Sequence, residues 1–226
     1  MGGAGTDRMS PKIKICGLNS EEAVAAARAG GAEFVGFVFY APSPRNVTPE
    51  RAGELAAPLR GRTQIVALTV DGDDDLLARI EAGLRPDWYQ FHGKESAARV
   101  REIRARFGKP VAKAVHIANA QDIAAGAPYI DAADMLLYDA KAPDTLAGAL
   151  PGGNGICFDW DLLRGGNRAL PVMLSGGLDA DNVAAAIKAV RPDAVDVSSG
   201  VEKAPGVKDP ERIARFIERV RAAGEM

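Results

Sequence analysis

The sequence predicts an α/β fold, a single (β/α)8 TIM barrel with a parallel eight-stranded core. Eight short apolar runs recur along the 226 residues. Their usual interval is about 23 residues, which accommodates one strand, one helix and two short loops. Alternating strands and helices are typical of a parallel sheet, and eight such units close into a barrel. Because catalytic groups in such barrels lie at the carboxyl ends of the strands, the residues that follow each run are the candidates for function.

The strands are assigned to the apolar runs in chain order. The second run is apolar on both faces, which is expected of a strand that lies between the barrel interior and a shell of helices. Each run ends in glycine, serine or a titratable residue. The eight predicted strands are Lys12–Cys16, Phe34–Phe39, Ile65–Val70, Trp88–Phe91, Val111–Val115, Met135–Tyr138, Val172–Leu174 and Ala194–Val197.

Helix signals fill the intervals between the strands. Asn19 or Ser20 can cap a helix over Glu21–Ala29, whose acidic first turn suits the helix dipole. Thr48 followed by Pro49 marks the start of another helix, because proline is favoured at the first helical position. Two further helices are predicted, a charged amphipathic one over Arg99–Phe107 and a final one over Pro210–Ala223 that closes the barrel.

Composition excludes several classes of function. The net charge is −2 with acidic and basic residues interspersed, so the chain has no nucleic-acid or membrane footprint. The apolar stretches are too short to span a bilayer. The two cysteines allow one disulfide at most and nothing marks the chain as secreted, so we expect a reduced, cytoplasmic protein. The oligomeric state is not readable from the sequence.

The first ten residues are interpreted as a leader. They are polar and rich in glycine, and they lack the apolar core of a signal peptide, so residues 1–10 are expected to be disordered. Met9 is an alternative to Met1 as the native start. The catalytic barrel is then expected to occupy residues 11–226 as one domain.

The strongest functional signal is a pair of glycine and serine clusters after the last two strands. Glycine lets backbone N–H groups approach an anion, and serine adds a hydroxyl donor. The loops after strands seven and eight of a barrel are a recurrent phosphate site, whereas a single cluster would indicate only a tight turn. The predicted phosphate-binding residues are Ser175, Gly176, Gly177, Ser198, Ser199 and Gly200.

Two residues are candidates for acid–base chemistry. Cys16 ends the first strand, where it is either a thiolate base at the barrel mouth or a small buried apolar residue. Asp139 follows the sixth strand directly, so partial desolvation of its carboxyl would favour the protonated form that a general acid requires, although a helix cap is the alternative. Asp159 is interpreted as the N-cap of a short helix, and Cys157 as incidental.

Three further residues are predicted to bind substrate. Arg45 follows two prolines in the loop after the second strand, and its planar guanidinium suits a carboxylate. His92 ends the fourth strand, where it either polarises the substrate or supports another group, and His116 is placed similarly after the fifth strand. Asp196 precedes the second phosphate cluster and either orients other groups or faces the sugar. No residue spacing is typical of a metal site or of a dinucleotide fold.

The oversized interval before the seventh strand contains the glycine-rich segment Pro151–Gly155. This composition is unsuited to a helix or strand, and the segment lies where active-site loops occur. A mobile active-site loop is therefore predicted there.

Six motifs in the same order resemble those of phosphoribosylanthranilate isomerase of tryptophan biosynthesis. The similarity runs from about Lys12 to the end of the chain, and the set is far more specific than the barrel alone. The motifs are Lys14-Ile15-Cys16-Gly17, Gly36-Phe37-Val38-Phe39 with Ser43-Pro44-Arg45, Gln90-Phe91-His92-Gly93, Phe158-Asp159-Trp160, Leu174-Ser175-Gly176-Gly177-Leu178, and Val195-Asp196-Val197-Ser198-Ser199-Gly200-Val201-Glu202.

The resemblance implies an Amadori rearrangement of N-(5-phosphoribosyl)anthranilate to the 1-deoxyribulose phosphate isomer, without cofactor or metal. By its motifs the family's general base corresponds to Cys16 and its general acid to Asp139. The phosphate groups correspond to the two serine–glycine clusters, and the arginine that contacts the anthranilate carboxylate corresponds to Arg45. Lys14 shares a strand face with Cys16 and could favour the thiolate.

Departures from the family and competing functions remain open. The family often has Gly-Gly-Ser-Gly or Gly-Gly-Thr-Gly where this chain has Gly152-Gly153-Asn154-Gly155, and Leu68–Asp71 differs from the family's usual end of the third strand. The Amadori isomerase of histidine biosynthesis is one alternative, but its base is an aspartate on the first strand, and the acidic segment 71–75 would repel a second phosphate. A non-catalytic phosphate-binding barrel is the other, and it would need neither Cys16 nor Asp139.

Overall fold

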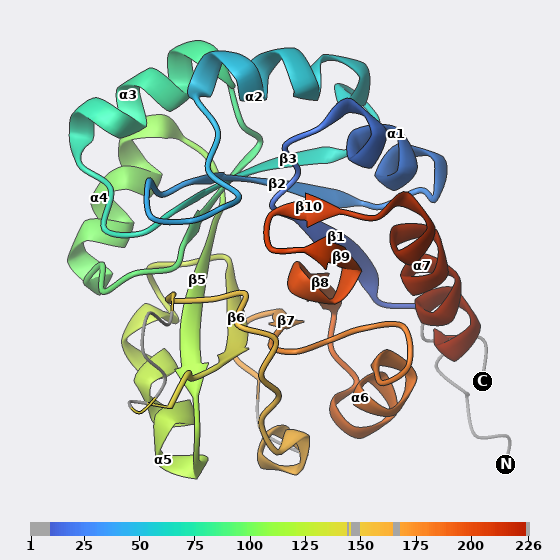
Figure 1. The fold of residues 1–226 in the computed structure, drawn as a ribbon. Helices are drawn as coiled ribbons and strands as arrows, with labels where there is room; N and C mark the ends of the chain where they lie inside the picture. Colours follow the sequence, from blue (N-terminus) through green and yellow to red (C-terminus); the bar gives the residue numbers. More distant parts are fainter. Residues whose placement is uncertain (1–9, 144, 146–149, 165–167, 225–226) are drawn as a thin grey trace, which may run out of the picture.

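Eight parallel strands form a closed barrel in chain order, β1 to β8, and each pairs with its sequence neighbours (Figure 1). The computed structural model describes residues 10–143, 145, 150–164 and 168–224, so the expected leader lies outside the described residues apart from Ser10. The strands are β1 (Lys12–Cys16), β2 (Phe34–Phe39), β3 (Gln64–Thr69), β4 (Trp88–Phe91), β5 (Val111–Ile117), β6 (Met135–Ala140), β7 (Val172–Leu174) and β8 (Ala194–Val197).

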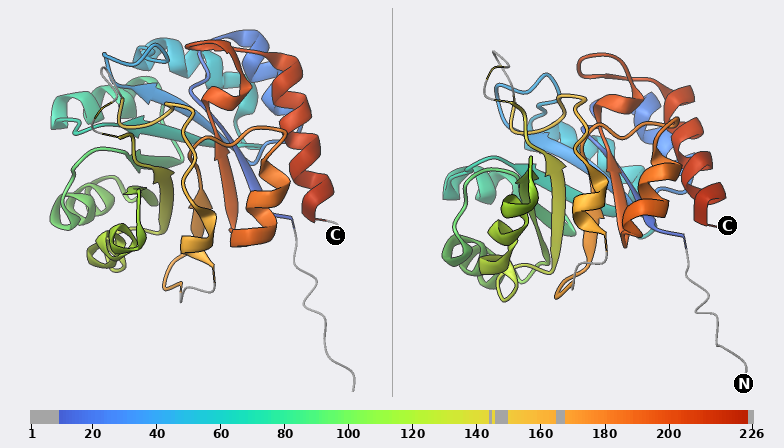
Figure 2. Two further views of the ribbon diagram at one scale, coloured as in Figure 1. Left: turned by 60° about the horizontal axis from the view of Figure 1, so that its bottom comes forward. Right: turned by 90° about the horizontal axis from the view of Figure 1, so that it is seen from below.

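The helices surround the barrel, and the last one lies beside the first. Figures 1 and 2 show α7 next to α1 and α6, which completes the outer ring. The helices are α1 (Glu21–Ala29), α2 (Pro49–Ala56), α3 (Asp74–Gly83), α4 (Ala97–Phe107), α5 (Ala120–Ile123), α6 (Val183–Val190) and α7 (Pro210–Gly224). Four short 3₁₀ segments add to them, η1 (Ala57–Leu59), η2 (Ala124–Tyr129), η3 (Trp160–Leu163) and η4 (Ser199–Val201).

The barrel interior is divided into an apolar part, here called lower, and a polar part at the carboxyl ends of the strands, here called upper. Small and large apolar side chains, among them Phe34, Ala114 and Met173, fill the lower part. The upper part contains buried polar groups at the carboxyl ends of the strands, including Lys14 and Gln90, both fully buried. Because side chains alternate along a strand, residues two apart, such as Lys14 and Cys16, share the interior face. The fold therefore places the buried polar and titratable side chains at one end of the barrel.

Most predicted boundaries are confirmed. Five strands agree residue for residue, as does α1, and the side chains of Ser20 and Thr48 accept the expected N-cap hydrogen bonds. β3 lies one residue earlier than predicted, and α4 begins two residues earlier, at Ala97, because Ser96 is its N-cap. The prediction was wrong for the ends of β5 and β6, which continue to Ile117 and Ala140. The reason is that the two strands stay paired, His116 with Asp139 and Ile117 with Ala140.

A short antiparallel hairpin, β9 (Glu202–Ala204) and β10 (Val207–Lys208), follows the barrel. It lies beside the loops after β1 and β2. Asn19, after β1, donates a hydrogen bond from Nδ2 to the carbonyl oxygen of Gly206 at 2.8 Å, and a Cβ at Gly206 would lie 2.5 Å from the carbonyl oxygen of Pro44, after β2. No helix in the described residues is long and apolar enough to cross a membrane.

We predict that Gly53→Ala lowers the melting temperature. A Cβ at Gly53 of α2 would overlap the carbonyl oxygen of Gly83 in α3, and a Cβ at Gly83 would lie 2.7 Å from the carbonyl carbon of Pro49. Alanine gains about 1 kcal/mol of helix propensity over glycine, whereas overpacking costs about 1–3 kcal/mol. Thermal unfolding measures the balance, and a higher melting temperature would show that the helix backbones do not meet.

Candidate active site

A pocket opens at the carboxyl ends of the strands and contains nearly every predicted site residue. It is lined by the ends of β1, β4, β6, β7 and β8 together with the loops that follow β2 and β6. Of the predicted site residues, Gly200 alone is not among those that line it. The absence of a side chain at Gly200 serves another purpose, because it allows η4 to pack against the carbonyl oxygen of Leu178.

The two serine–glycine clusters lie together at the ends of β7 and β8. The backbone N–H of Ser175 donates to the carbonyl oxygen of Tyr138 at 2.8 Å, which anchors the first cluster to β6. Gly176 and Gly177 have φ angles of 89° and 61°, in the left-handed region that favours glycine. Lys208 donates from Nζ to the carbonyl oxygen and hydroxyl of Ser198, at 2.9 and 3.1 Å. A buried cation thus supports the second cluster, and the sequence analysis missed it.

Cys16 lies beside a buried ion pair. Lys14 Nζ is 2.9 Å from Asp196 Oδ1, and the hydroxyl of Ser175 donates to Asp196 Oδ2 at 3.3 Å. Gly36 leaves room for this group, since a Cβ there would lie 2.9 Å from Cys16 Sγ and 3.2 Å from Lys14 Nζ. Asp196 lines the pocket while its carboxylate is held by Lys14 and Ser175.

The charges around Cys16 oppose one another. Burial raises the pKa of the Cys16 thiol and Asp196 raises it further, while Lys14 lowers it, and the result is a pKa above the ordinary value. Lys14 therefore acts in the predicted direction but does not outweigh burial. For Lys14 itself, burial lowers the pKa, but the charges and hydrogen bonds of Asp196 and Cys16 together outweigh burial, so its pKa is raised and it stays protonated.

Arg45 lies at the pocket in a bidentate ion pair with Glu202. Its Nε and Nη2 donate to the two carboxylate oxygens at 2.7 and 2.9 Å, and Nη2 also donates to the carbonyl oxygen of Gly153 at 3.2 Å. Lys208 Nζ is 2.8 Å from Glu202 Oε1. Burial raises the pKa of Glu202, but Arg45 and Lys208 lower it more, so the carboxylate is ionised. The sequence analysis quoted Glu202 in a motif without assigning this role.

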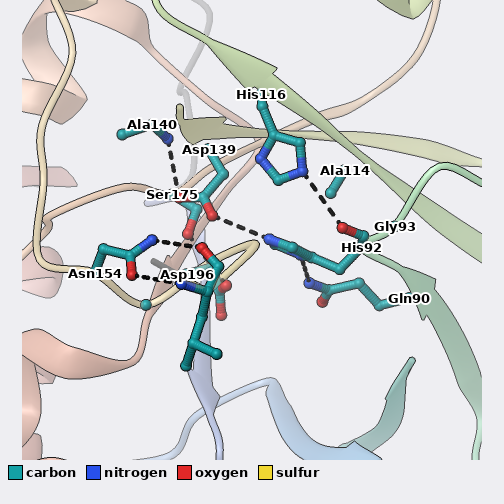
Figure 3. A network of polar contacts seen from close by, with 12 residues as sticks. Gln90, His92, Gly93, Ala114, His116, Asp139, Ala140, Asn154, Ser175 and Asp196 are labelled. Carbon is teal, nitrogen blue, oxygen red and sulfur yellow. Dashed lines mark hydrogen bonds and ion pairs between the residues drawn. The ribbon is translucent and has the colours of Figure 1, made fainter. Parts of the chain in front are cut away.

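Asp139 is hydrogen-bonded on both carboxylate oxygens (Figure 3). Oδ1 accepts from the backbone N–H of Ala140 at 3.0 Å, and Oδ2 lies 3.0 Å from His92 Nε2. His92 Nδ1 in turn lies 3.1 Å from Gln90 Nε2. His92 thus supports the candidate acid. Gln90 was missed as a functional residue, although its position two residues before His92 places both on one strand face.

His116 lies against His92 rather than at the centre of the pocket. Its Nε2 is 3.3 Å from the carbonyl oxygen of His92, and the two rings meet edge to face with centroids 5.1 Å apart. Burial lowers the pKa of His116. Donor atoms of His92, His116 and Asp139 lie within 4.8 Å of one another, a set whose chemistry suits a transition metal. Three different strands contribute these residues, so no sequence spacing could indicate the cluster.

The described part of the glycine-rich loop covers this arrangement. A Cβ at Gly152 would lie 2.5 Å from His92 Nε2 and 2.8 Å from Asp139 Oδ2, and one at Gly153 would lie 2.5 Å from Arg45 Nη1. Asn154 braces the loop through two hydrogen bonds to the backbone of Leu150. The predicted place of the loop at the site is confirmed, whereas its mobility stays a prediction. Asp159 caps η3, as predicted.

The fold and site define a (β/α)8 barrel in which one pocket holds a buried thiol, a buried carboxyl and two serine–glycine clusters. The family model described as N-(5'phosphoribosyl)anthranilate (PRA) isomerase matches residues 13–219. The chain belongs to this family. It is therefore an isomerase of the intramolecular oxidoreductase class that acts on an aldose–ketose pair.

Relatives cover nearly the whole chain. N-(5'-phosphoribosyl)anthranilate isomerase of Mesorhizobium japonicum is 48% identical over 215 residues, 95% of this chain and 97% of that protein. The Afipia carboxidovorans protein of the same name is 51% identical over 215 residues, 95% of this chain and 91% of that protein. The crystal structure of phosphoribosyl anthranilate isomerase from Thermotoga maritima has a TM-score of 0.84 at 34% identity, covering 94% of this chain and 99% of that one.

A further solved structure of phosphoribosyl anthranilate isomerase is a complex with reduced 1-(o-carboxyphenylamino)-1-deoxyribulose 5-phosphate. Its TM-score is 0.81 at 32% identity, and the match covers 94% of this chain and 99% of that one.

We predict that Lys14→Met moves the alkylation of Cys16 to higher pH. Lys14 lowers the pKa of the thiol more than Lys208 does, and Asp196 raises it, so removing the Lys14 ammonium alone removes the largest contribution that favours ionisation. The rate of iodoacetamide alkylation against pH, measured in a Cys157→Ser background, reports this pKa because the thiolate is the nucleophile.

Lys14→Met combined with Asp196→Asn is the matched control, since it removes both charges and leaves no unpaired ion. Its alkylation profile should lie between those of the parent and of Lys14→Met. An unchanged profile in all three proteins would contradict the electrostatic assignment.

Proposed function

We propose that this chain converts N-(5-phosphoribosyl)anthranilate into 1-(2-carboxyphenylamino)-1-deoxyribulose 5-phosphate, with Asp139 as general acid and Cys16 as general base. The observation that carries the proposal is that one pocket holds both groups beside the two serine–glycine clusters. Family membership supports the substrate, and the bound compound named for the related crystal structure is a reduced form of the proposed product.

The first step is opening of the ribose ring. Asp139 gives its proton to the ring oxygen, the bond from C1 to that oxygen breaks, and the nitrogen lone pair forms an iminium. The carboxylate that remains is stabilised by hydrogen bonds from Ala140 and His92. The loop at Gly152 covers this carboxylate, which suits a step that water would otherwise compete with.

The second step removes the proton from C2. The iminium makes that proton acidic, and the Cys16 thiolate accepts it to give an enolamine, which tautomerises to the ketone. Because burial raises the pKa of Cys16, only a small fraction of the thiol is ionised at neutral pH. We therefore expect kcat/KM to rise with pH through the alkaline range as this fraction grows.

The two ends of the substrate would bind to different groups of the pocket. The serine–glycine clusters supply hydroxyl and backbone donors for the phosphate. Arg45 would bind the anthranilate carboxylate: in the part of the chain that the structure describes, Nε and Nη2 are used by Glu202 and Gly153 and Nη1 has no protein acceptor. Asp196 would act through Lys14 and Ser175, which it holds.

A cytoplasmic location belongs to the same proposal. Both cysteines are free, and Cys157 is exposed. A free, exposed thiol fits a reducing compartment.

Turnover of freshly prepared N-(5-phosphoribosyl)anthranilate by the purified protein tests the function directly. Asp139→Asn should lower kcat by about 10²-fold or more, because the amide keeps the shape but has no proton to give. Cys16→Ser should lower kcat comparably, since serine does not ionise near neutral pH. Cys157→Ser is the control and should retain activity. Full activity in Asp139→Asn, or in Cys16→Ser, would overturn the assigned role of that residue.

Arg45→Ala should weaken binding of the substrate far more than binding of an analogue that lacks the carboxylate. The variant removes a guanidinium that can hold the carboxylate by charge-assisted hydrogen bonds. KM for the substrate and inhibition constants for product analogues with and without the carboxylate measure the difference. Equal losses for both analogues would show that Arg45 only braces the loop.

A further inference from the structure

We propose that Gln90 is a positioning residue for the acid, because its side-chain amide holds His92 as the neutral tautomer that donates from Nε2 to Asp139. The inference rests on the proposed function only for its effect on catalysis. The hydrogen-bond chain itself is a property of the ligand-free protein, and it can be tested without substrate.

The chain of hydrogen bonds joins three side chains at the ends of two strands. Gln90 belongs to β4, His92 directly follows that strand, and Asp139 belongs to β6. Gln90 Nε2 lies 3.1 Å from His92 Nδ1, and His92 Nε2 lies 3.0 Å from Asp139 Oδ2. Gln90 is fully buried, and His92 and Asp139 are 5% and 4% exposed. Figure 3 shows the three side chains in one line that ends at the carboxylate.

The direction of the hydrogen bonds follows from the donors available. An amide nitrogen only donates, so His92 Nδ1 must offer its lone pair to Gln90. A neutral imidazole with a bare Nδ1 carries its proton on Nε2, which then donates to Asp139 Oδ2. The backbone N–H of Ala140 occupies one lone pair of the other oxygen. Asp139 is thus held from two sides with its remaining lone pairs free for a proton and the substrate.

The arrangement carries a cost that favours a functional role for Gln90. Among the described residues its Oε1 has no hydrogen-bond partner although it is buried. An unsatisfied buried acceptor is destabilising, and a methionine of similar length would fill the interior without leaving such an acceptor. Glutamine differs from methionine in that it can donate a hydrogen bond to His92.

Two other titratable side chains lie near His92 and leave its ring nitrogens to Gln90 and Asp139. The ring of His116 lies edge to face with that of His92 at a centroid distance of 5.1 Å. Lys113 Nζ donates to the carbonyl oxygen of Gly93, the residue after His92, at 2.8 Å and lies 3.3 Å from Glu95.

Nitrogen NMR of the protein labelled at histidine tests the proposal. The chain has two histidines, so His116→Gln assigns the remaining signals to His92. In the ligand-free protein at neutral pH we expect a protonated Nε2 and a bare Nδ1 on His92. A protonated Nδ1, whether in the other tautomer or in an imidazolium, would overturn the proposal, and this measurement needs no substitution at Gln90.

Gln90→Met and Gln90→Glu extend the test to catalysis. Methionine removes the donor, and we expect mixed tautomers and a kcat lowered by about tenfold with KM little changed, the effect of one hydrogen bond. Glutamate offers only acceptors when ionised, so His92 Nδ1 should become protonated. Thr69→Val is the matched control, because Thr69 is also buried and its hydroxyl has no hydrogen-bond partner among the described residues, so the substitution removes no hydrogen bond to His92.

The two proposals fail in different ways. A normal tautomer and kcat in Gln90→Met would refute the role of Gln90 while Asp139→Asn still tests the acid. The expected tautomers in all proteins, with a fully active Asp139→Asn variant, would refute the acid and leave the hydrogen-bond chain intact.

Discussion

The buried ion pair between Lys14 and Asp196 is the interaction on which the site depends. The two residues are direct register partners across β1 and β8, where the barrel closes, and their side chains are 1% and 5% exposed. Removing one partner of such a pair costs about 3–5 kcal/mol, because the other charge stays buried. The same pair determines the field at Cys16, where Lys14 and Asp196 act in opposite directions. Closure of the fold and reactivity of the thiol are thus coupled.

A second group of charges lies at one end of the pocket. Arg45 and Lys208 share the single carboxylate of Glu202, so one positive charge is left over at this end of the pocket. Burial lowers the pKa of Lys208, and Glu202 raises it in turn. Because Lys208 also contacts Ser198, the excess charge lies between the candidate phosphate loop and the arginine. A substrate with a negative group at each end matches this distribution.

The sequence was sufficient for the fold because the barrel is specified by local periodicity, and the apolar runs predicted five strands residue for residue. It was less sufficient for the site. Single residues at strand ends, such as Cys16, could be placed in the pocket, but their partners could not. Glu202 reaches Arg45 across 157 positions, and Asp139 appeared to follow a strand that in fact continues through it. Such contacts depend on register and on loop packing, which leave no local pattern.

The composition of the glycine-rich loop follows from the side chains that lie directly beneath it. Gly152 lies over His92 and Asp139, and Gly153 lies over Arg45, each at a distance that leaves no room for a Cβ. Backbone atoms, without side chains, therefore cover Asp139 and Arg45. A larger side chain would displace either the loop or the groups beneath it. The loop can lie this close to the carboxyl only because glycine occupies these positions, and Asn154 braces the approach by binding the backbone of Leu150.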